Sequence, residues 1–113
     1  MKRFSVICIC LALNGGTSAA GQKVFEGDEA AALRCANMIA LTGIALGGAE
    51  LISVPEKDVM IALSFLILEL HVTGTRSQKL AALEVMQARR SPEATLKDYR
   101  DNAQRCLKRF PIN

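Results

Sequence analysis

The segment SPEATLKDYRDNAQRCLKRF, residues 91–110, carries the clearest structural pattern in this chain. Its apolar side chains recur at steps of three and four residues, so they share one face of an α-helix that we expect to be buried. These side chains are Leu96, Tyr99, Ala103, Cys106, Leu107 and Phe110. Ser91-Pro92-Glu93 is a typical helix start with proline in the first turn, and we expect the helix to end near Arg109, before Pro111.

A second helix face of this kind lies near the beginning of the chain. We predict a helix over residues 28–52, with Asp28 as its N-cap and Glu29 near the positive end of the helix dipole. Its stripe consists of Ala31, Cys35, Met38, Ile39, Thr42, Ala45, Leu46 and Ala49. Because Cys35 and Cys106 both lie on such faces, we interpret them as a structural disulfide, whereas redox pairs usually stand closer together as C-x-x-C. Closing so long a loop contributes roughly 4 kcal/mol in the chain-entropy model.

Two further helices are predicted between these. Ser53-Val54-Pro55-Glu56 fits a capping box for a helix that ends near Thr73, before Gly74. Thr75-Arg76-Ser77-Gln78 begins another helix, which ends around residues 89–90. The sequence lacks alternating strand patterns and hairpin turns, which indicates an all-α fold. Since short connections make consecutive helices antiparallel, we expect a small four-helix up-down-up-down bundle whose first and fourth helices are joined by the disulfide.

The second of the four predicted helices is apolar on almost every side. Its polar residues form one narrow line at heptad spacing, through Lys57, Ser64 and His71. A helix of this composition is usually covered by its neighbours on all sides, so we expect it to be the central element of the bundle.

Gly43 and Gly47 form a GxxxG motif in the first predicted helix, on the same side as several alanines. Small residues on one face allow a second helix backbone to approach closely. The uncharged stretch of residues 36–49 is too short to span a bilayer, so we expect close packing against the second helix. A soluble dimer through the face of Gly43 and Gly47 is the alternative.

The N-terminal residues have the pattern of a secretory signal peptide. Met1-Lys2-Arg3 precedes an apolar run over residues 4–13, and the small residues Ser18-Ala19-Ala20 close the segment. We therefore predict a signal peptide over residues 1–20, cleaved after about Ala20, then a flexible lead-in over residues 21–27 and a single helical domain over residues 28–113. The mature chain would be periplasmic or secreted, would not span the membrane, and would keep Cys35 and Cys106 as its cysteines.

Charge is unevenly distributed, because acidic residues predominate in residues 21–72 and basic residues in residues 73–113. The densest group, here called the basic cluster, consists of Arg89, Arg90, Lys97, Arg100, Arg105, Lys108 and Arg109. A solvated helix face is the ordinary interpretation of such a run, and a surface that faces a partner is the alternative. Loss of Lys2 and Arg3 with the signal peptide would lower the formal net charge of +3 by two, and so small a charge with few aromatic residues does not indicate nucleic-acid binding.

Catalytic and ligand-binding motifs are not recognisable in this sequence. His71 is the single histidine, and its neighbouring turns lack the ligands that a metal site needs, so we expect no catalytic residue, metal or cofactor. The sequence predicts an exported, non-catalytic protein that acts through contacts with an envelope protein, as an adaptor, inhibitor or chaperone-like component. Two alternatives are a carrier of a small apolar ligand or lipid, held in a cavity between the first two helices, and a pH-responsive periplasmic chaperone.

Overall fold

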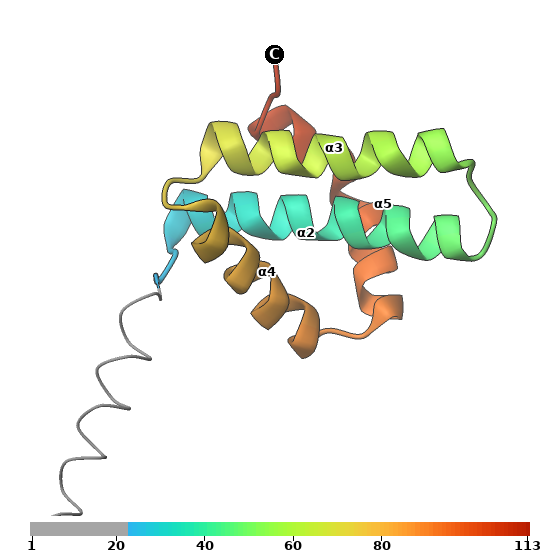
Figure 1. The fold of residues 1–113 in the computed structure, drawn as a ribbon, viewed down its shortest axis with the longest axis horizontal. Helices are drawn as coiled ribbons and strands as arrows, with labels where there is room; N and C mark the ends of the chain where they lie inside the picture. The colour runs from blue at the N-terminus through green and yellow to red at the C-terminus, as the bar shows by residue number, and fades with distance from the viewer. Residues whose placement is uncertain (1–22) are drawn as a thin grey trace, which may run out of the picture.

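A computed structural model of the protein describes residues 23–113, which form an all-helical domain (Figure 1). This part of the chain contains four α-helices and no strand: α2 (Gly27–Gly48), α3 (Val54–His71), α4 (Arg76–Arg89) and α5 (Pro92–Arg109). The all-α prediction is thus confirmed for the described residues. The predicted signal peptide, residues 1–20, and its cleavage after Ala20 lie outside them.

Three of the four predicted helix starts are built as the sequence indicates. The hydroxyls of Ser53 and Thr75 accept the amide hydrogens of Glu56 and Gln78, and the side chains of those two residues bond back to the N-cap amides. The hydroxyl of Ser91 accepts the amide hydrogen of Ala94 at 3.1 Å. Each cap satisfies amide groups that the first turn of a helix leaves without a partner.

Both ends of α2 differ from the prediction. Its N-cap is Glu26, which makes no side-chain cap, and Asp28 lies inside the first turn. The helix ends at Gly48 and not near residue 52, because Glu50 adopts a left-handed φ of 59°. The amide of Leu51 then bonds back to the carbonyl of Leu46 at 2.8 Å, which closes the helix in the manner of a Schellman motif. The sequence hides this stop, since glycine usually occupies the left-handed position.

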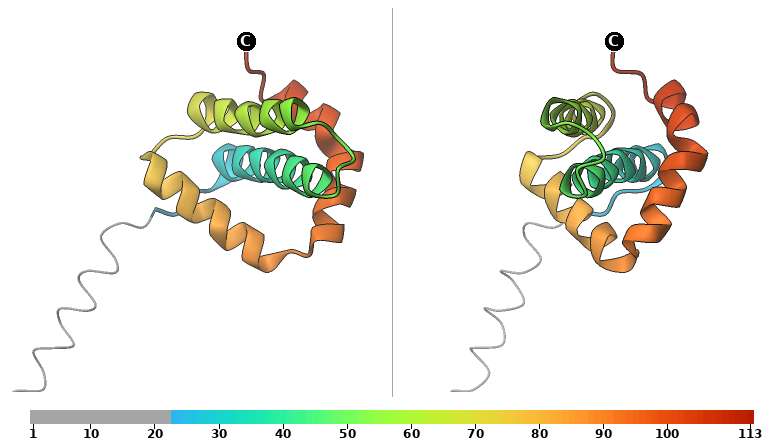
Figure 2. Two further views of the ribbon diagram at one scale, coloured as in Figure 1. Left: turned by 45° about the vertical axis from the view of Figure 1, so that its right-hand side comes forward. Right: turned by 90° about the vertical axis from the view of Figure 1, so that its right-hand side faces the viewer.

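The central element is α2, and the prediction that the second helix would be central was wrong. Figures 1 and 2 show α2 surrounded by α3, α4 and α5, and it contacts all three. Its buried residues are Ala32, Leu33, Cys35, Ala36, Asn37, Met38, Ile39, Thr42 and Gly43. On α3 the buried residues are Ser64, Ile67 and Leu68, because α2 is its one extensive neighbour among the described helices.

The backbones of α2 and α3 approach closely at Gly43 and Gly47, as the sequence predicts. A Cβ atom on Gly43 would lie 3.0 Å from Cβ of Met60, and one on Gly47 would lie 2.7 Å from Cδ of Lys57. A second copy of the chain on this face would therefore have to displace α3. By length and composition α2 is apolar enough to cross a membrane, and 50% of its most apolar window is buried inside this domain.

The expected up-down-up-down arrangement is not shown. α2 and α3 lie side by side, but α4 leaves α3 through a bend of 120° and passes beside α2 (Figure 1). Figure 2 shows α5 crossing α2 on the side away from α4. The predicted disulfide is present between buried Cys35 of α2 and buried Cys106 of α5, with their Cα atoms 5.6 Å apart. This bond fixes the crossing point of the two helices.

Candidate functional site

The outer side of α3 is apolar and uncovered. Its side facing α2 carries Ile67 and Leu68 together with the predicted polar line, in which Ser64 is buried and its hydroxyl donates to the carbonyl of Ile61 at 2.7 Å. The sides of α3 that do not face α2 carry five large apolar side chains that are between 39% and 65% exposed, and these are Val54, Val59, Phe65, Leu66 and Leu70. A surface of this kind is typical of an interaction site.

Part of this surface forms a continuous row along the helix axis. Pro55, Val59, Ala62, Leu66 and Leu70 are all exposed and follow one another at steps of four, three, four and four residues. This row is called the α3 stripe below. Such spacing places side chains on one face of a helix and is typical of a face that packs against another helix.

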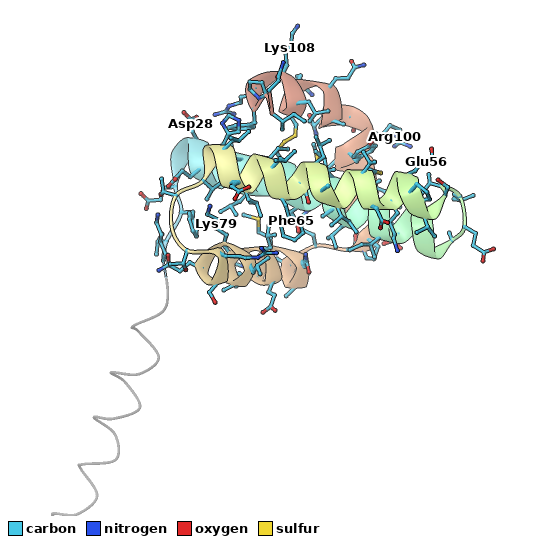
Figure 3. The ribbon with its side chains drawn as sticks, turned by 45° about the horizontal axis from the view of Figure 1, so that its top comes forward. Asp28, Glu56, Phe65, Lys79, Arg100 and Lys108 are labelled. Atoms are coloured by element: carbon cyan, nitrogen blue, oxygen red, sulfur yellow. A yellow bond between two sulfur atoms is a disulfide. The ribbon has the colours of Figure 1, made fainter. Side chains whose placement is uncertain are left out.

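Beside the α3 stripe lies a groove of about 470 Å³ between α3 and α4, called the apolar groove. Its lining consists of Ala62, Phe65, Leu66, Leu68, Glu69, Arg76, Lys79 and Leu80. Figure 3 shows Phe65 between α3 and α4, with Lys79 nearer to the connection of the two helices. The guanidinium of Arg76 lies 5.2 Å from the centre of the Phe65 ring, a cation–π contact at the rim.

Polar contacts hold the connection between α3 and α4, and so fix the shape of the apolar groove. The ammonium of Lys79 donates to the carbonyl of Leu68, at the end of α3, over 3.0 Å. A carboxylate oxygen of Glu29 accepts the amide hydrogen of Thr73 at 2.6 Å, and the ammonium of Lys23 donates to the hydroxyl of Thr73 at 2.6 Å. The hydrogen bonds from Thr73 lower the pKa of Glu29 below its ordinary value, since they favour the ionised carboxylate.

His71 has a structural position at the end of α3. Its Nε2 donates to the carbonyl of Pro111 at 2.7 Å, and its ring meets the ring of Phe110 edge to face at 5.4 Å. It therefore holds the C-terminal segment against α3. Among the described residues no group of three or more His, Cys, Asp or Glu side chains is placed to bind a metal ion.

Four of the seven cations in the basic cluster form ion pairs with acidic neighbours. Arg90 pairs with Asp98 at 2.6 Å and Lys97 with Asp101 at 2.7 Å, while Arg100 lies 3.8 Å from the same Asp101. The pKa of Asp101 is lowered, chiefly by its hydrogen bond from Lys97.

The other members of the basic cluster lie along the rest of α5 and beside its start. Arg109, at the end of α5, pairs with Asp28 in the first turn of α2. Arg105 bonds to the side chain of Asn102. Arg89 is exposed, and Arg100 and Lys108 project from α5 toward solvent (Figure 3). This geometry supports the interpretation of the cluster as a solvated helix face.

Sequence reasoning missed the α3 stripe, although a signal was present. The second helix has apolar residues in every direction, whereas α4 and α5 each offer few large apolar side chains to cover it.

A comparison of the chain with protein-family models, curated proteins and solved structures finds no match. The candidate site therefore rests on the geometry of this chain alone.

The Glu29 contact predicts a pH dependence of stability. The pKa of Glu29 in the folded protein is below its ordinary value of 4.5. The contribution of its carboxylate to folding stability is therefore complete above pH 4.5 and is lost as the pH falls through the folded-state pKa. Glu29→Gln should therefore reduce the fall in unfolding midpoint when chemical denaturation is measured between about pH 6 and pH 3. Glu84→Gln, on the exposed side of α4, is the matched control. Identical pH profiles for the wild-type protein and Glu29→Gln would contradict the assignment.

Proposed function

We propose that this chain is an exported, non-catalytic protein that acts through protein–protein contacts made by the α3 stripe and the apolar groove. One observation carries the proposal: the folded domain leaves the apolar side of its second helix in solvent. Each Å² of apolar surface left in water forgoes about 25 cal/mol of stabilisation that a partner could supply. Exposed surface of this kind is a cost for a protein that works alone and an advantage for one that works by contact.

The shape of the surface supports a helical occupant. α3 is 18 residues long, so its free side extends for about 27 Å at 1.5 Å per residue. A row of apolar side chains at helical spacing, next to a groove with a charged rim, is the arrangement by which proteins bind an amphipathic helix. We accordingly propose that the site holds an apolar-faced helix of a protein in the cell envelope.

The carrier alternative has less support. It requires a cavity between the first two helices, and at Gly43 and Gly47 that space is occupied by Met60 and Lys57. The apolar groove is instead open between α3 and α4. The pH-responsive chaperone keeps one supporting contact, since acid would protonate Glu29 beside the connection that shapes the groove.

The proposed localisation is the periplasm or the exterior of the cell. The apolar N-terminal segment and a disulfide between Cys35 and Cys106 both support export, because such bonds persist in oxidising compartments. Mass spectrometry of the exported chain should find its amino terminus at about Gly21 and both remaining cysteines oxidised. A chain that starts at Met1, or one with free thiols, would contradict export by this route.

The proposed contact surface is tested by photo-crosslinking in the native envelope. A photoreactive amino acid in place of Leu66, in the α3 stripe, should give a covalent product with one identified protein. The same group in place of Lys97, on α5, should not. Leu70→Asp should abolish the product, whereas Val85→Asp, at an exposed apolar position on α4, should leave it.

Both aspartate variants should keep the thermal stability of the wild-type protein, because the side chains they replace are exposed. Equal labelling from positions 66 and 97, or a product that survives Leu70→Asp, would refute the proposed surface.

A further inference from the structure

We propose, building on the function above, that the helix held at the α3 stripe is α3 of a second copy of this chain. In this arrangement two copies pack antiparallel about a two-fold axis that passes near the middle of α3. A two-fold interface requires a surface that is complementary to itself. The spacing of the stripe and the charges beside it both meet that requirement.

The apolar residues match when α3 is paired with its own reverse. With the axis between residues 62 and 63, Val59 lies opposite the partner copy's Leu66, and Pro55 lies opposite the partner copy's Leu70. Each of these side chains is exposed in the single domain, so each gains a contact on pairing. The small side chain of Ala62 at the crossing point allows two helices to approach closely there.

The charges favour the antiparallel direction over the parallel one. Asp58 lies seven residues before Phe65, on the same flank of α3, and the guanidinium of Arg76 lies over the Phe65 ring. Antiparallel pairing brings Asp58 of each copy toward the partner copy's Phe65, where the cations of Arg76 and Lys79 outnumber Glu69, the one carboxylate that lines the apolar groove. Parallel two-fold pairing would instead place these flanks on opposite sides of the interface, so Asp58 would not meet Arg76 of the partner copy.

The size of this contact sets its expected strength. A pairing along one 18-residue helix and the rim of the apolar groove lies near the low end of specific interfaces, which begin at about 1,200 Å². We expect a dimer in reversible exchange with monomer, with a dissociation constant on the order of micromolar. Its formation needs no component other than this chain.

The test uses the mature exported protein with its disulfide intact. Ala62→Cys places a thiol next to the two-fold axis, so mild oxidation should convert this variant into a covalent dimer. Ala88→Cys, at an exposed alanine on α4, should stay monomeric under the same conditions.

Sedimentation velocity of the wild-type protein should show monomer and dimer exchanging over the micromolar range. Asp58→Arg should raise the dissociation constant about tenfold, because two opposite-charge pairs are lost per dimer.

The double variant Asp58→Arg with Arg76→Asp should restore dimerisation, since the charge pairs are then reversed and not removed. The second-copy proposal would be overturned if the wild-type protein remained monomeric at concentrations about 100-fold above the micromolar range. If the photoreactive group at position 66 still captured another protein in that case, the proposed function would stand. The proposed axis would be overturned if oxidation gave as much covalent dimer with Ala88→Cys as with Ala62→Cys. It would also be overturned if Asp58→Arg left the dissociation constant unchanged. Failure of both self-association and capture would overturn both proposals.

Discussion

The close contact between α2 and α3 at Gly43 and Gly47 is the constraint on which the rest of the structure depends. Without side chains at these positions, Met60 and Lys57 can lie directly against the α2 backbone. This contact sets the rotation of α3 about its own axis. The side of α3 that carries Ser64 therefore faces α2, and the opposite side, with Val59 and Leu66, faces solvent. The apolar surface of the domain is a consequence of this packing.

Local signals in the sequence were sufficient for the helices and the disulfide. Capping residues such as Ser53 and Thr75 act within one turn, so the sequence alone places the starts of α3 and α4. The stripes through Cys35 and Cys106 predicted which sides of α2 and α5 meet. The end of α2 was not predictable in this way, because Glu50 takes a left-handed conformation that glycine normally occupies.

The arrangement of the helices depends on non-local competition for α2. The apolar composition of the second helix predicted burial on all sides, but α4 buries Leu83 alone and packs beside α2. In this structure α4 and α5 both pack on α2 and not on α3, and α2 has small residues on one face and the disulfide on another. The apolar surface of α3 is thus what remains exposed once α2 is enclosed. The partly paired charges of α5 lie on a separate surface, so contact through α3 and solvation through α5 do not compete.

The most direct test of this account is a measurement of which side of α3 meets α2. Nuclear Overhauser effects in the isotope-labelled mature protein should connect the α protons of Gly43 to the side chain of Met60, and those of Gly47 to the side chain of Lys57. The methyl groups of Val59 and Leu66 should show no such effect to Gly43 or Gly47, whether or not the chain is dimeric. Strong effects between Gly47 and either of those methyl groups would show that α3 packs through its apolar side, and would contradict the account.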